Sequence, residues 1–275
     1  MKYFFFYLLV IFFSTQGNAQ FYYFDIIGTK QTNTLYKQVR VAAYKKITGI
    51  SYNGSEPSKD FVLEQTISKD GKTILTRSAS VGSTETFFTG YYDVDRIVKS
   101  ADSGKNAITT VQYEYDSTGK LQSINSVSND FDGTFTNTED HLWSYNQKGL
   151  PEKMLKIKNM VDTTVVSFIY DEENQVAEER WTKSNRSIET YYYYYNQKKQ
   201  ITDIVKYNRK AKAMLPDFIF EYNDMDQLSQ MTQTQSGSAN YLIWRYTYND
   251  QGLKVREVAY NKEKELMGRI EYSYQ

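Results

Sequence analysis

From Val111 to the C-terminus, large apolar or aromatic residues alternate with polar ones in short stretches that recur along the chain. The stretch from Val111 to Tyr115 is typical, because Val111, Tyr113 and Tyr115 are separated by Gln112 and Glu114. Side chains two apart lie on the same face of a strand. The short length and the β-branched and aromatic content also favour strand over helix. The pattern therefore predicts many strands, each with one buried, tyrosine-rich face.

Each stretch ends in a four-residue motif. The motif consists of an aromatic residue, any residue, Tyr and, in most copies, Asp or Asn. The motif tyrosines are separated by 30, 25, 25, 27, 26 and 26 residues, at Tyr115, Tyr145, Tyr170, Tyr195, Tyr222, Tyr248 and Tyr274. A period in this range indicates an array of one supersecondary unit. A lone hairpin is marginally stable, so consecutive hairpins must pair edge to edge. A long twisted sheet then curls. We expect an all-β fold: an antiparallel meander of tandem β-hairpin repeats curled into a spiral, an open barrel or a sandwich, with the tyrosines inside.

The turn after each motif has its own chemistry. The Asp or Asn after the Tyr can accept a hydrogen bond from a backbone N–H two residues on, which closes an Asx-turn. Hairpin loops built on a type I turn end with a residue in the left-handed region, which Gly, Asn and Asp adopt at low cost. The residues four after the Tyr are Gly119, Gly149, Asn174, Lys199, Asp226 and Gly252. Lys199 is the exception, and we expect strain or a changed loop there.

The first part of the chain is less regular. We divide it into a signal peptide at 1–19 and one hairpin-repeat domain at 20–275, with irregular N-terminal hairpins at 20–102 and clear repeats at 103–275. The sequence of residues 61–76 predicts a hairpin. We interpret Tyr91–Tyr92–Asp93 as a copy of the motif with a shorter turn. The segment from Leu35 to Ile47 fits a strand or a helix. We prefer a strand there because its neighbours are strands.

The phrase from Tyr115 to Leu121, Tyr-Asp-Ser-Thr-Gly-Lys-Leu, resembles the Tyr-Asp (YD) repeat of bacterial RHS-type proteins. The Tyr-Asn copies at 145, 195, 222 and 248 resemble the degenerate form common in secreted proteins of Bacteroidota. The resemblance runs from about Val111 to the C-terminus and implies an architecture rather than an activity. Large members of the family wind many repeats into a hollow shell around a toxic C-terminal segment. This chain has few repeats and no non-repetitive segment after Tyr274, so that role is not carried over.

The N-terminus indicates export. A basic start at Met1–Lys2, an apolar run at Tyr3–Phe13 and the small residues Gly17 and Ala19 predict a signal peptide cleaved before Gln20. The mature protein would lie in the periplasm, on the outer-membrane surface or outside the cell. No other segment is long and apolar enough for an integral membrane span. The chain has no cysteine, so we expect no disulfides.

Composition narrows the possible chemistry. With 33 basic and 33 acidic residues, a nucleic-acid partner is not expected. His141 is the only histidine, and with no cysteine a usual zinc site is nearly excluded; a packed strand residue is the preferred interpretation of His141. The segment Asn129–Gly133 could offer oxygen ligands to calcium, but a polar turn is preferred. We predict no metal and no cofactor.

Three functions stay open. The first is a non-catalytic secreted or cell-envelope scaffold or interaction surface, whose partner is an unknown protein or glycan. The second is a carbohydrate-binding module using Tyr192 and Tyr194, which stand on the face opposite the presumed core, since sugar rings stack on exposed aromatic rings. The third is a glycoside hydrolase using paired carboxylates, whose spacing cannot be read from sequence. We favour the first, and name no catalytic residue.

Overall fold

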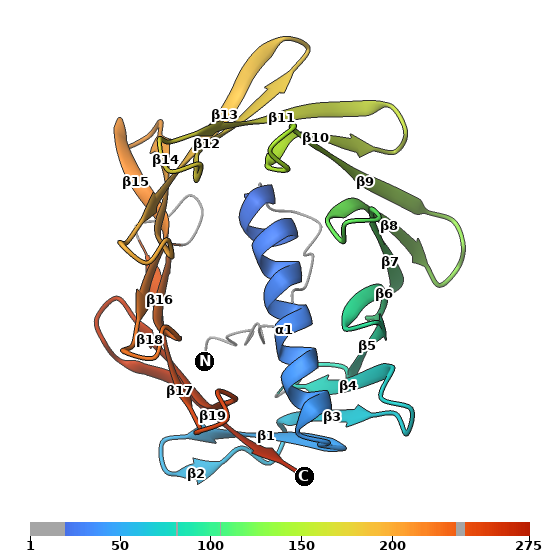
Figure 1. Ribbon diagram of the computed structural model, residues 1–275. Coiled ribbons are helices and arrows are strands. Elements are labelled where there is room, and N and C mark those ends of the chain that lie inside the picture. The colour runs from blue at the N-terminus through green and yellow to red at the C-terminus, as the bar shows by residue number, and fades with distance from the viewer. Residues whose placement is uncertain (1–19, 81, 105, 235–239) are drawn as a thin grey trace.

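A ring of strands surrounds one helical segment in the computed structural model (Figure 1). The structure describes residues 20–80, 82–104, 106–234 and 240–275. The helical segment comes first: a π-helix, η1 (Tyr22–Ile27), continues directly into the α-helix α1 (Gly28–Val41). Figure 1 shows α1 running inside the ring. We call η1 and α1 together the plug.

The strands follow the plug in chain order. In the described residues they are β1 (Lys46–Asn53), β2 (Glu56–Pro57), β3 (Val62–Ile67), β4 (Thr73–Ala79), β5 (Thr86–Asp93), β6 (Arg96–Ser103), β7 (Ala107–Tyr115), β8 (Leu121–Asp130), β9 (Thr136–Tyr145), β10 (Pro151–Lys158), β11 (Asp162–Tyr170), β12 (Val176–Lys183), β13 (Arg186–Tyr195), β14 (Ile201–Asn208), β15 (Ala213–Tyr222), β16 (Leu228–Thr234), β17 (Tyr241–Tyr248), β18 (Lys254–Asn261) and β19 (Leu266–Tyr274).

Nearly every strand pairs antiparallel with the next, which confirms the predicted hairpin meander. The sheet closes because β1 pairs with β3 on one side and with β19 on the other, from Ile47 opposite Tyr274 to Tyr52 opposite Arg269. Within the described residues the wall is an 18-strand barrel, with the short β2 attached to β1. Closure removes sheet edges. The C-terminal strand, which could have offered a free edge, is therefore covered by β1.

The tyrosine-rich face points into the barrel, as predicted. Val111 and Tyr113 on β7, and Tyr191 and Tyr193 on β13, are all buried. The motif tyrosines are partly buried. Those from Tyr115 to Tyr248 pack against the same core, and Tyr274 packs against a second, smaller cluster that includes Ile47 and Leu253. The hydroxyls of the motif tyrosines donate to a backbone carbonyl near the start of the adjacent strand: Tyr115 to Ile97, Tyr145 to Leu121, Tyr170 to Pro151, Tyr195 to Val176, Tyr222 to Ile201, Tyr248 to Leu228 and Tyr274 to Lys254. The repeat thus needs Tyr rather than Phe, because the hydroxyl ties each unit to the one before it.

The turns follow the predicted geometry. Asp116 Oδ1 accepts the N–H groups of Thr118 at 2.8 Å and Lys120 at 3.0 Å, and the other motif Asp and Asn residues repeat this arrangement. All six residues four after the Tyr have positive φ, including Lys199 at 61°. A left-handed residue with a Cβ carries about 1–2 kcal/mol of strain. The loop therefore keeps the common geometry, and Lys199 is strained.

The preference for a strand between Leu35 and Ile47 is wrong. α1 continues to Val41, and β1 begins only at Lys46, so the first hairpin starts later than predicted. The buried residues Thr29, Tyr36 and Val39 follow helical spacing. A helix pairs its own backbone groups, so it can stand in the barrel interior, where an isolated strand would leave unpaired N–H and C=O groups.

Candidate functional site

The start of the plug is held by one buried carboxylate. Glu179 on β12 is fully buried and accepts the backbone N–H groups of Phe21 and Tyr22, at 2.9 and 3.0 Å. It also accepts Trp181 Nε1–H at 2.7 Å and the Tyr193 hydroxyl at 2.6 Å. Burial raises the pKa of Glu179, although these hydrogen bonds favour its charged form. Four donors from the plug and the wall therefore converge on a single side chain.

A second buried contact links the plug to strand β9, three strands along the wall from β12. Asp25 Oδ2 lies 2.7 Å from His141 Nδ1 and accepts Trp143 Nε1–H at 3.1 Å. His141 Nε2 is 3.1 Å from Glu139, whose other oxygen is 3.0 Å from Lys156 Nζ. Burial alone would lower the pKa of His141, but the charge of Asp25 and hydrogen bonds to Asp25 and Glu139 raise it to about 9. At neutral pH the imidazolium is therefore the counter-charge of the buried Asp25.

Further contacts hold the rest of the plug. The Asn33 side-chain oxygen accepts Ile97 N–H at 2.8 Å, the Tyr36 hydroxyl donates to Gly71 O at 2.8 Å, the Tyr36 ring stacks on Tyr92 at 3.8 Å, and Arg40 pairs with Asp95 at 2.6 Å. Over the described parts of the chain, no helix is both long enough and apolar enough to cross a membrane. The plug is thus a helix with polar anchors along its length.

The two carboxylates that contact His141 are already engaged. Asp25 and Glu139 both contact the His141 ring, so neither is an open carboxylate of the kind that glycoside hydrolysis needs. In the described ranges, no group of three or more His, Cys, Asp or Glu side chains is placed to hold a metal ion. Asp130, in the segment considered for calcium, accepts hydrogen bonds from Thr134 and Phe135 within its own turn. These contacts are those of a polar turn.

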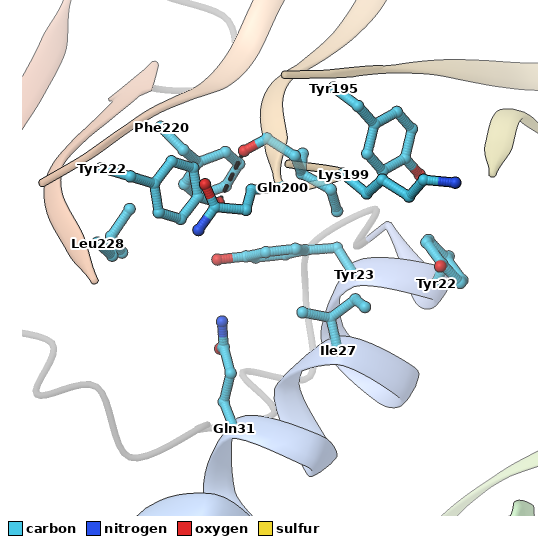
Figure 2. A pocket seen from close by; sticks show the side chains of 11 residues that line it. Tyr22, Tyr23, Ile27, Gln31, Tyr195, Lys199, Gln200, Phe220, Tyr222 and Leu228 are labelled. Atoms are coloured by element: carbon cyan, nitrogen blue, oxygen red, sulfur yellow. Dashed lines mark hydrogen bonds between the residues drawn. The ribbon is translucent and has the colours of Figure 1, made fainter. Parts of the chain in front are cut away.

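A cavity of about 190 Å³ lies between the plug and the wall from β13 to β16. Figure 2 shows the Tyr23 hydroxyl and the Gln31 amide directed toward the same open space, with Tyr222 on the wall side. The Tyr23 ring packs against Phe220 at 5.1 Å between centroids. Burial raises the pKa of Tyr23, and it raises that of Tyr222 to about 12. The cavity is thus lined by phenols, amides, aromatic and aliphatic side chains and one cationic residue, Lys199.

The structure places the two predicted binding residues on the outside of the barrel. Tyr194 on β13 is 53% exposed, and Tyr192 is half-buried on the same outward face. Their neighbours in register are Glu178 on β12, opposite Tyr192, and Asp203 on β14, opposite Tyr194. The two tyrosines are on one face and far from the plug-side cavity. Whether they bind a glycan stays a prediction.

The interpretation of His141 as a packed strand residue agrees with its buried position on β9. Sequence reasoning missed Asp25 and Glu179; Glu179 occupies an inward-facing position on β12 beside the apolar Trp181. A charged residue on an otherwise apolar face was the available signal, because a buried charge needs a partner. The partner could not be named, since Asp25 and His141 are 116 residues apart in the chain.

Comparison with known proteins gives structural likeness only. No family model matches the chain, and no curated protein is similar to it. A porin-like protein from Bacteroides uniformis is 11% identical, with a TM-score of 0.38 over 84% of this chain and 98% of that one. A porin-like protein from Bacteroides vulgatus is 16% identical, with a TM-score of 0.33 over the same shares. The Photorhabdus luminescens Tc holotoxin pore is 12% identical, with a TM-score of 0.35 over 76% of this chain and 12% of that one. At these values the likeness says nothing about activity.

Proposed function

We propose that this protein is an exported, non-catalytic β-barrel scaffold of the bacterial cell envelope, whose outer wall and loops form an interaction surface. The predicted signal peptide supports export, and the YD-like repeats support a structural role. The observation that carries the proposal is the anchoring of the plug. Buried hydrogen bonds to Glu179 and His141 at its start, and the buried Tyr36–Gly71 hydrogen bond farther along, fix it to the wall. A barrel filled in this way is a rigid body that presents its outside.

The first test measures whether the plug is part of that rigid body. In hydrogen–deuterium exchange of the full protein, we expect the amides of Gly28–Val41 to exchange about as slowly as those of the wall strands, because opening them requires breaking the buried anchors. The exposed turn at Met160, between β10 and β11, serves as the fast reference. Plug amides that exchange about 100-fold faster than protected wall amides would contradict the proposal, because the plug would then leave the barrel on its own.

Glycan binding at the outer face of β13 is the second candidate. The observation in its favour is the pairing of exposed aromatic rings, Tyr192 and Tyr194, with the acceptors Glu178 and Asp203 on neighbouring strands. A sugar can stack its C–H groups on the rings while its hydroxyls donate to the carboxylates.

A glycan array tests this candidate. If a glycan binds here, the double variant Tyr192→Ala/Tyr194→Ala should lose at least about tenfold in affinity, since stacking on two rings is worth more than about 1.4 kcal/mol. The matched control is Tyr207→Ala, because Tyr207 is 49% exposed on the adjacent strand β14. An array with no bound glycan, or equal losses in both variants, removes this candidate and leaves the scaffold.

A further inference from the structure

The cavity beside the plug contains two polar groups that the fold itself does not use. Within the described residues, the Tyr23 hydroxyl and the Gln31 amide have no hydrogen-bond partner, and both face the cavity (Figure 2). Polar groups at the other side of the cavity are occupied. The hydroxyls of Tyr195 and Tyr222 donate to backbone carbonyls at 2.9 and 2.8 Å, and the Gln200 amide donates to Asp226 O at 3.0 Å. Gln31 is an exposed residue and Tyr23 is partly buried, so both polar groups can exchange water for a guest.

The walls around these two groups are aromatic. The Tyr23 ring is fixed by Phe218 and Phe220, at centroid distances of 5.7 and 5.1 Å. Tyr195 and Tyr222 complete the wall side. Aliphatic side chains and the exposed cation Lys199 complete the lining. Apolar surface with a few polar groups that set orientation is typical of small-molecule sites.

The volume sets the size of the guest. The cavity volume is about 190 Å³. This is below the range of about 300–1,000 Å³ that drug-sized ligands occupy. One six-membered ring with hydroxyl substituents suits both the size and the mix of ring faces, hydroxyl and amide.

Irregular backbone also occurs at this cavity. Lys199, the one strained departure from the Gly, Asn and Asp series at the motif turns, also lines this cavity. Strained backbone in a folded protein clusters at ligand sites. The π-helix η1, which carries Tyr23, is a further irregularity of a kind frequent at functional sites. Two departures from regular structure, far apart in the chain, therefore meet at one cavity.

We propose that this cavity binds a single neutral pyranose ring, either as a free monosaccharide or as the terminal unit of a glycan. The Tyr23 hydroxyl and the Gln31 amide exchange hydrogen bonds with the sugar hydroxyls, while the C–H faces of the sugar pack on the aromatic rings. Because burial raises the pKa of Tyr23, its phenol stays a neutral donor. The site is separate from the outer tyrosines and does not depend on glycan binding there.

The test is titration of the full protein with glucose, galactose and mannose, followed by protein NMR, with glucuronic acid as a charged comparison. We expect a saturable shift with one neutral hexose, and about tenfold weaker binding in both Tyr23→Phe and Gln31→Ala, the loss of about one hydrogen bond. Tyr23→Phe keeps the ring packing. The matched control is Gln38→Ala, since Gln38 lies on the same helix but does not line the cavity, and its affinity should not change.

Three results would overturn the proposal. The first is the absence of a saturable shift up to about 10 mM sugar, well above a millimolar dissociation constant, which means that the cavity holds water only. The second is binding that Tyr23→Phe and Gln31→Ala leave intact but Tyr192→Ala/Tyr194→Ala abolishes, which places the sugar on the outer wall. The third is preference for glucuronic acid over every neutral hexose, which assigns a different ligand.

Discussion

Replacing His141 by alanine is expected to lower the free energy of unfolding by about 3–5 kcal/mol, the range seen when one partner of a buried ion pair is removed. Asp25 is fully buried, and His141 is the cation it contacts at 2.7 Å. The other carboxylate oxygen of Asp25, Oδ1, has no hydrogen-bond partner among the described residues. The variant would therefore leave the buried Asp25 without its cationic partner, with only the Trp143 Nε1–H hydrogen bond remaining. Urea denaturation at pH 6 measures the change.

The pH dependence of this loss has a defined sign. His141 has a pKa of about 9 in the folded protein and 6.5 as its ordinary value, so the folded state binds this proton more tightly. Its contribution is fully present below pH 6.5 and is lost as the pH rises through about 9. The groups that face His141 are Asp25, Glu139 and Phe21. The stability difference between wild type and His141→Ala should thus shrink between pH 6.5 and 9.

A double-mutant cycle with Asp25→Asn provides the control for this prediction. If the pair acts as described, His141→Ala should cost much less in the Asp25→Asn background, because no buried charge remains to be compensated. A loss below about 1 kcal/mol in the wild-type background, or one that grows toward pH 9, would contradict the ion pair.

Replacing Glu179 by glutamine should destabilise the protein by about 2–5 kcal/mol. The carboxylate accepts four hydrogen bonds with its two oxygens. In glutamine one oxygen becomes an NH₂ group, so two of the four donors lose their acceptor inside the barrel, and each buried unpaired group costs about 1–3 kcal/mol. The measurement is chemical denaturation combined with hydrogen exchange at Tyr22–Ile27, which should speed up more than exchange in the wall.

The neighbouring residue supplies a matched control. Glu178 lies on the same strand but on the outer face, where it pairs with a half-exposed Arg180. Glu178→Gln should change stability by no more than about 0.5–1 kcal/mol, because exposed ion pairs contribute little. Equal losses in the two variants would show that removing either carboxylate charge from β12 destabilises the protein to the same extent. Glu179 would then have no special role in holding the plug.

The repeats could be predicted from the sequence because their signals are local. Alternation places Val111 and Tyr113 on one face, and Asp116 and Gly119 define the turn four residues later. Both features depend on neighbours within about ten residues, so the interactions that cause them are visible in a single stretch. The deviation at Lys199 was visible for the same reason.

The interior could not be predicted in the same way. The segment that forms α1 has a pattern compatible with a strand, and only its place in the lumen decides between the two forms. Asp25 and His141, or Phe21 and Glu179, are brought together by the closing of a barrel, and their separations in the chain are 116 and 158 residues. The cavity at Tyr23 and Gln31 follows from that docking.

The sequence by itself determined the hairpin unit, its inward tyrosines and its turns, because strand periodicity and turn chemistry act over a few residues. Only the tertiary structure decided that the meander closes through β1 and β19, that a helix fills it, and which charges meet inside. Closure joins the first and last strands, and docking joins the N-terminal helix to strands in the middle of the chain, so both depend on contacts between residues far apart in sequence. The strength of a buried charge pair depends on the burial that these contacts create.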